Sequence, residues 1–76
     1  PAGVKVVTGT GLFALRALFD AHVHLNRPDQ DARLLVANGV LFARDMGGPT
    51  DERLAVRERA RRGDLSGLDL AVTGTI

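Results

Sequence analysis

The chain of 76 residues contains no cysteine, which excludes disulfide bonds, thiolate metal sites and cysteine nucleophiles. It also has no tryptophan or tyrosine and only three phenylalanines, so its core must rest on valine, leucine and alanine. The ten basic residues face nine acidic ones, for a formal net charge of +1, and this balance predicts no nucleic-acid partner. No apolar run is long enough to span a membrane, so we expect no membrane partner.

The two ends of the chain are typical of a segment of a longer protein. It begins with Pro1 and stops at Ile76, directly after a strand-like run. The N-terminus lacks a positively charged leader followed by an apolar run, so we expect no signal peptide and a cytoplasmic location. Hydrophobic residues make up 45% of the chain and charged residues 25%, which is a globular balance.

The pattern of apolar residues predicts an alternation of strands and helices from residue 18 onward. We expect strands at residues 4–8, 18–25, 40–43 and 68–73, helices at about residues 29–37 and 50–62, and an ambiguous apolar segment at residues 12–17. The order β-α-β-α-β with short connections predicts an α/β fold in which helices pack against a parallel sheet.

Local signals place the helix ends. Asp29 or Asp31 is expected to cap the first helix, and Thr50 the second. Gly39 and Gly63 follow the two helices, as glycine in the left-handed conformation does at helix C-termini. Four arginines crowd the last part of the second helix, where they suit the negative end of its dipole, so they need no nucleic acid to explain them.

The segment with most chemical information is His22-Val23-His24, which holds the only two histidines of the chain. On a β-strand, residues two positions apart point to the same face. Two neutral imidazoles on one face can bind a single metal ion, and imidazole suits zinc, iron and nickel. A pair of this kind also occurs by chance in strands.

A nucleotide site is an alternative. Gly9-Thr10-Gly11 follows the first predicted strand and begins a G-x-G-x-x-A pattern that ends at Ala14. Asp29 lies about 20 residues further on, where a ribose-binding acid belongs. Such a site needs a helix N-terminus next to the glycines to hold the pyrophosphate. A plain glycine turn accounts for the same residues.

Three segments together resemble the amidohydrolase superfamily, in its imidazolonepropionase-like and prolidase-like branch. They are residues 19–25 with the pattern D-x-H-x-H, residues 38–40 (Asn-Gly-Val) and residues 44–48 (Arg-Asp-Met-Gly-Gly). The resemblance implies that residues 1–17 are the end of a small β-sandwich and the lead-in to a barrel. It further implies that residues 18–76 are the first βαβαβ portion of a (β/α)₈ TIM barrel.

The resemblance also implies chemistry. His22 and His24 would be ligands of a divalent metal, zinc by preference, with one or two ions in the complete protein. A metal-activated water would hydrolyse a C–N bond of an amide, lactam or dipeptide. The expected partners are a small-molecule substrate and the remaining segments of the barrel, and a homo-oligomer is left open. Asp20 is expected to support the strand end, and Asp45 to pair with a nearby arginine.

The further ligands of that family are not in this sequence. The single lysine, Lys5, precedes the histidine motif and is not the family's bridging lysine. A barrel of this kind needs roughly 250 residues, and a catalytic zinc usually has three protein ligands. We therefore expect no hydrolase activity from this chain alone. An inert α/β fragment remains a third interpretation.

Overall fold

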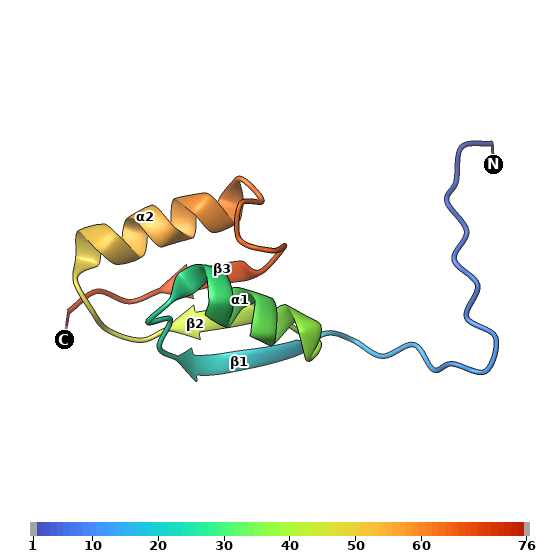
Figure 1. The fold of residues 1–76 in the computed structure, drawn as a ribbon, viewed down its shortest axis with the longest axis horizontal. Helices are drawn as coiled ribbons and strands as arrows, with labels where there is room; N and C mark the ends of the chain where they lie inside the picture. The colour runs from blue at the N-terminus through green and yellow to red at the C-terminus, as the bar shows by residue number, and fades with distance from the viewer. Residues whose placement is uncertain (1, 76) are drawn as a thin grey trace.

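Three parallel strands and two helices alternate along the chain in the computed structural model, which describes residues 2–75 (Figure 1). The elements are β1 (Leu18–Val23), α1 (Pro28–Ala37), β2 (Val40–Asp45), α2 (Thr50–Arg61) and β3 (Asp69–Val72). The sheet has the order β1-β2-β3, and both neighbouring pairs are parallel. The predicted β-α-β-α-β order and the parallel sheet are confirmed.

Both helices cover the same face of the sheet. One buried cluster joins Ala32 of α1 and Val56 of α2 to Ala43 of β2 and Leu70 of β3. The other members of this cluster come from the loops: Leu25, Leu65 and Leu68. Side chains along β2 alternate between the two faces of the sheet. Ala43 and Asp45 are buried, whereas Phe42 and Arg44 are exposed.

The opposite face of the sheet has no helix among the described residues. Phe19 of β1 and Phe42 of β2 are register partners there. Their rings stack with centroids 6.4 Å apart, and they remain 62% and 42% exposed. Parallel sheets are normally covered on both faces, so this face of the sheet is incompletely buried.

Helix α1 begins before both of the predicted capping residues. Pro28 occupies the first turn and Arg27 is the N-cap, without a side-chain capping bond. Proline suits this position because its missing N–H would have no partner there. The carboxylate of Asp31 instead accepts a hydrogen bond from the Arg27 backbone N–H, at 2.8 Å, which ties the first turn of the helix to its N-cap residue. The predicted cap by Asp29 or Asp31 is therefore wrong in register.

The N-cap of helix α2 lies one residue before the predicted Thr50. Pro49 is the N-cap, and Thr50 is already helical. The Thr50 hydroxyl accepts a hydrogen bond from the backbone N–H of Thr75, beyond β3, at 3.4 Å. The helix ends at Arg61, and Gly63 follows with a φ of 80°, so the predicted stop at this glycine is confirmed.

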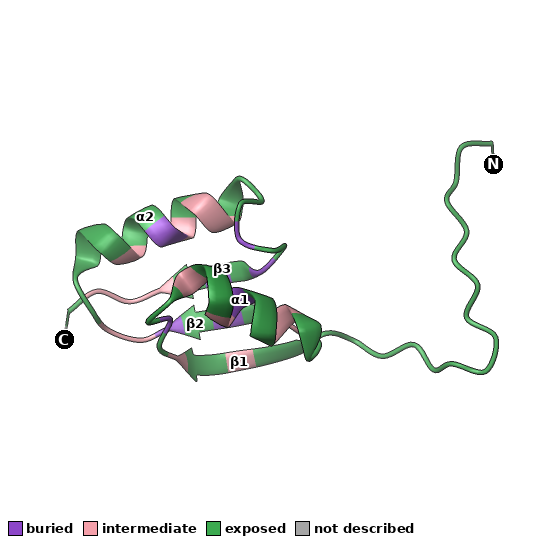
Figure 2. Cartoon of the chain, in the orientation of Figure 1, coloured by how far each residue is buried: buried purple, intermediate pink, exposed green. Residues whose placement is uncertain are grey.

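The strand predicted at residues 4–8 is wrong. Residues 2–17 form turns and extended chain without a strand or helix, and they lead away from the sheet (Figure 2). Their large apolar side chains stay in solvent: Val6 is 86% exposed and Phe13 95%. β-Branched residues favour a strand only where a partner strand and a packed face are present. The assignment of residues 1–17 to a β-sandwich stays a prediction.

Neither α1 nor α2 has the length and apolar character needed to cross a bilayer, and these are the helices found in residues 2–75.

The exposed N-terminal segment generates a deletion prediction. Residues 2–14 contribute no side chain to the buried cluster. When residues 1–14 are removed, we therefore expect the thermal unfolding midpoint to move by less than about 4 °C, the shift caused by ~1 kcal/mol in a domain of this size. Far-UV circular dichroism measures it. A larger drop would show that the segment packs on the sheet.

Candidate metal centre

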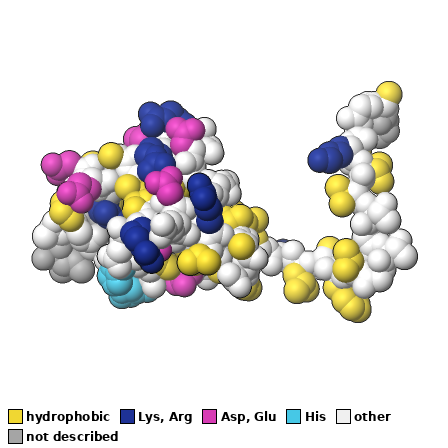
Figure 3. Space-filling view, viewed as in Figure 1, with side chains coloured by type: hydrophobic (Ala, Val, Ile, Leu, Met, Phe, Trp, Pro, Cys, Tyr) yellow, Lys and Arg dark blue, Asp and Glu magenta, His cyan; other side chains and the backbone are white. Residues whose placement is uncertain are grey.

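The two histidines lie where β1 ends. His22 is the penultimate residue of the strand, and His24 follows Val23, its final residue. Both side chains are exposed, and they form one group on the surface shown in Figure 3. Their ring centroids are 5.2 Å apart, with the planes inclined at 77°.

This separation suits two ligands of one ion. Two imidazoles bound to a tetrahedral zinc through bonds of ~2.0–2.1 Å have ring centres about 5 Å apart. The donor set is also appropriate, because neutral imidazole is a common zinc ligand. The ring separation and the donor type are therefore both consistent with two ligand positions of one divalent metal site.

The histidine pair begins within an irregular stretch of β1. Asp20 pairs with Ala43 and Val23 pairs with Asp45, so three steps along β1 match two steps along β2. Val23 packs against the buried cluster on the helix-covered side. His22 and His24 lie on either side of it, and both are exposed. His24, which follows the end of the strand, also lines a pocket with Leu34 and Leu35 of α1.

Asp20 stabilises this irregular stretch. Its Oδ1 accepts a hydrogen bond from the backbone N–H of His22, at 3.0 Å. The carboxylate is thus engaged with the backbone that carries the first candidate ligand. This bond agrees with the predicted supporting role of Asp20 at the strand end.

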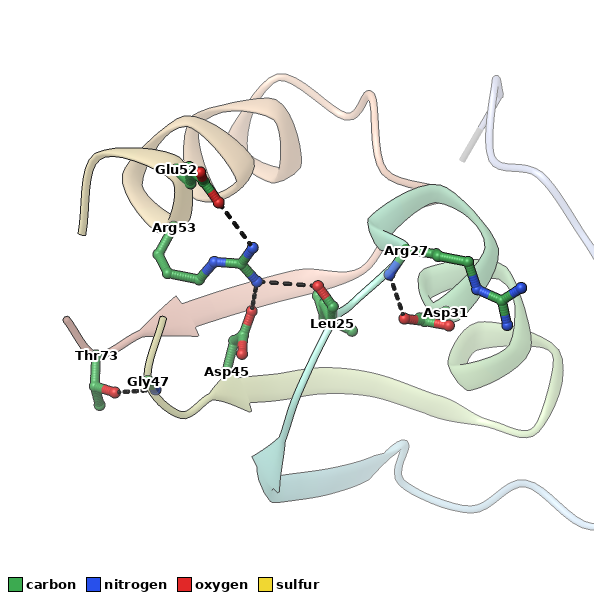
Figure 4. A network of polar contacts seen from close by, with 8 residues as sticks. All are labelled: Leu25, Arg27, Asp31, Asp45, Gly47, Glu52, Arg53 and Thr73. Atoms are coloured by element: carbon green, nitrogen blue, oxygen red, sulfur yellow. Dashed lines mark hydrogen bonds and ion pairs between the residues drawn. The ribbon is translucent and has the colours of Figure 1, made fainter. Parts of the chain in front are cut away.

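The buried Asp45 is the centre of a polar network at the same edge of the sheet (Figure 4). Its side chain is 1% exposed and forms an ion pair of 2.7 Å with Arg53 of α2, which is 14% exposed. The same Nη1 donates to the carbonyl oxygen of Leu25, at 3.0 Å. The predicted ion pair of Asp45 with a nearby arginine is confirmed.

Backbone hydrogen bonds join the ends of all three strands. The Met46 N–H donates to the Val23 carbonyl at 2.9 Å, and the Thr73 N–H to the Asp45 carbonyl at 3.0 Å. The Gly47 N–H donates to the Thr73 hydroxyl at 2.8 Å. The carboxyl edge of the sheet is therefore a connected unit, to which the histidine segment belongs.

A cavity of about 440 Å³ opens at this edge. It lies between the strand ends and the start of α2, and its polar lining includes His24, Asn26, Asp45, Glu52 and Arg53. Within residues 2–75, no group of three or more histidine, aspartate or glutamate side chains is placed to hold one ion. The described chain thus offers two ligands and an adjacent cavity.

The geometry that the nucleotide alternative requires is not formed. Residues 9–12 make a turn closed by a bond of 2.9 Å from the Leu12 N–H to the Gly9 carbonyl, and residues 12–17 are not helical. Thr10 and Gly11 therefore have no helix N-terminus beside them. Asp29, the expected ribose ligand, lies in the first turn of α1 and pairs with Arg59 of α2.

Two features of this edge are not predicted from the sequence. The bulge has no signal there, because no glycine or proline interrupts residues 18–25. Arg53 is one of nine arginines, and nothing in its neighbours singles it out as the partner of Asp45. Its position in the first turn of a helix that follows a strand-end aspartate is the one available hint.

No family model, curated protein or solved structure matches this chain. Its function is therefore inferred from the residues and contacts described above.

The buried ion pair generates a stability prediction. Arg53→Met leaves the Asp45 carboxylate buried without its cation, so we expect the free energy of unfolding to fall by about 3 kcal/mol. Arg61→Met is the matched control, because it breaks only the exposed pair with Glu58 and should cost less than about 0.5 kcal/mol. Urea unfolding followed by circular dichroism measures both. Equal effects would contradict the structural importance of the buried pair.

The pair between α1 and α2 generates a pH prediction. The hydrogen bond from the Arg59 side chain lowers the pKa of the Asp29 carboxyl below its usual value. The stability that this carboxylate adds is present above its unfolded-state pKa and is lost as the pH falls through the lower folded pKa. In Arg59→Gln, the Asp29 pKa should rise toward its usual value, as measured by NMR of the carboxyl carbon. An unchanged titration would show that the pair does not form in solution.

Proposed function

We propose that this chain is a segment of a metal-dependent hydrolase of the amidohydrolase type, in which His22 and His24 bind a divalent metal. The observation that carries the proposal is the placement of both imidazoles at the carboxyl end of β1, with their ring centroids 5.2 Å apart. Barrels of parallel strands place their active sites at this end of the strands.

The arrangement of the sheet supports the proposal in a second way. Three adjacent parallel strands with their helices on one face have the order that begins a (β/α)₈ barrel. In such a barrel, the helix-free face with Phe19 and Phe42 would line the interior, and the remaining strands would cover it. Those strands would supply the further ligands.

Zinc is the metal we propose first, because two imidazoles and no thiolate suit it. An ion bound there would polarise the carbonyl group of the substrate and lower the pKa of a water molecule. Substrates would be small molecules with an amide, lactam or dipeptide C–N bond. The Asp45 carboxylate forms an ion pair with Arg53, so we propose that it supports the strand end and takes no part in proton transfer.

The first test is zinc binding by the chain itself. We expect Zn²⁺ to shift the ring resonances of His22 and His24 together in NMR spectra. His22→Ala and His24→Ala should each weaken binding at least about tenfold, because each removes one of two ligands. Gln30→Ala, an exposed change on α1, is the matched control. Binding that is unaffected by both histidine changes would refute the metal site.

Turnover is a separate measurement. With dipeptide and lactam substrates plus zinc, we expect no hydrolysis by this chain alone, because two ligands leave the site one short of the usual three. A thermal shift with NAD but none with zinc would favour the nucleotide alternative, and no response to either would favour an inert fragment.

A further inference from the structure

The peptide groups on either side of the histidine segment are both held by arginine side chains. Arg44 of β2 donates through Nε to the carbonyl oxygen of Ala21, at 2.8 Å. Arg53 of α2 donates to the carbonyl oxygen of Leu25, at 3.0 Å. Ala21 directly precedes His22, and Leu25 directly follows His24. The segment is therefore fixed at both ends by groups from other elements.

The hydrogen bond at Ala21 lies within the bulge. Between Asp20 and Val23, β1 departs from regular pairing with β2, and β1 has no strand on its other side among the described elements. Backbone at an irregular edge has fewer ladder bonds to fix its conformation. The Arg44 guanidinium crosses from the neighbouring strand and supplies a charge-assisted bond at this place.

The two arginines differ in what else they do. Arg53 also neutralises the buried Asp45, so its loss would affect the whole fold. Arg44 is exposed, and within residues 2–75 its bond to Ala21 is the single hydrogen bond of its side chain. Its guanidinium forms no ion pair with the described carboxylates. The hydrogen bond of Arg44 is thus directed at the bulge alone.

We propose that Arg44 is a positioning residue for the histidine pair: its bond to the Ala21 carbonyl holds the irregular backbone from which the two neighbouring imidazole rings project. This inference rests on the proposed metal-binding function. Groups that orient metal ligands in this way typically change metal affinity 10- to 100-fold when removed, as an order of magnitude.

The sign of the effect separates positioning from electrostatics. A positive charge near a divalent cation repels it, so removing that charge should by itself tighten zinc binding. Positioning predicts the opposite, because a free bulge no longer presents the two rings together. Arg44→Met removes the charge and the donor, whereas Arg44→Lys keeps the charge and offers a different donor.

Zinc binding to the 76-residue chain, measured by calorimetry, is the experiment. We expect Arg44→Met to bind Zn²⁺ about tenfold more weakly, and Arg44→Lys to lie between this variant and the unsubstituted chain. Arg33→Met is the matched control, because Arg33 is an exposed arginine on α1, and it should leave the affinity unchanged. Equal or tighter binding by Arg44→Met would overturn the proposal.

A measurement without metal keeps this inference distinct from the proposed function. In the metal-free chain, the two rings with centroids 5.2 Å apart should give a nuclear Overhauser effect between them, and Arg44→Met should abolish it. Retention of this effect in the variant would overturn the positioning role, whether or not zinc binds. If the unsubstituted chain fails to bind zinc but Arg44→Met still abolishes the effect, the metal site is refuted and the positioning role is supported.

Discussion

The ion pair between Asp45 and Arg53 is the interaction on which the arrangement of this chain depends. A carboxylate that is 1% exposed is costly in a protein interior unless a cation and further hydrogen-bond donors accompany it. Arg53 satisfies this requirement from α2 and bonds the loop after β1 with the same nitrogen. The buried cluster is small and contains no aromatic side chain. The ion pair therefore adds a contact between elements that this apolar cluster connects only through small or medium-sized side chains. It joins the second strand, the second helix and the segment that carries the histidines.

The alternation of strands and helices could be predicted because each element from residue 18 onward carries its own local signals. Gly39 and Gly63 end the helices, and the apolar runs between them form the strands. The segment at residues 4–8 carries equally good strand signals and forms no strand, because pairing depends on a neighbour that composition does not reveal. The N-caps lie two residues before Asp29 and one residue before Thr50. A proline stands at each of these helix starts, and its fixed backbone angle favours that position.

The candidate site was predictable in its residues but not in its geometry. The spacing of His22 and His24 indicates that the rings share a side, and the structure places them together. Alternation alone does not say which side, because the pairing of β1 with β2 is irregular at two places, between Leu18 and Phe19 and between Asp20 and Val23. The partner of Asp45 and the hydrogen bond of Arg44 to Ala21 depend on how three elements meet in space. Contacts between different elements produce no periodic pattern of residue types in the sequence.

The bulge makes the position of the imidazoles depend on chain length as well as on residue identity. Three steps along residues 20–23 of β1 match two steps along residues 43–45 of β2, so β1 holds one extra residue in this stretch. A chain one residue shorter in this stretch could keep the same apolar pattern, the same two histidines and the same sheet order. Its pairing with β2 would then be regular, two steps against two, and the bulge that carries the hydrogen bond from Arg44 to Ala21 would be lost. Insertions and deletions between residues 20 and 23 are therefore expected to disturb the site even where every side chain that it uses is retained.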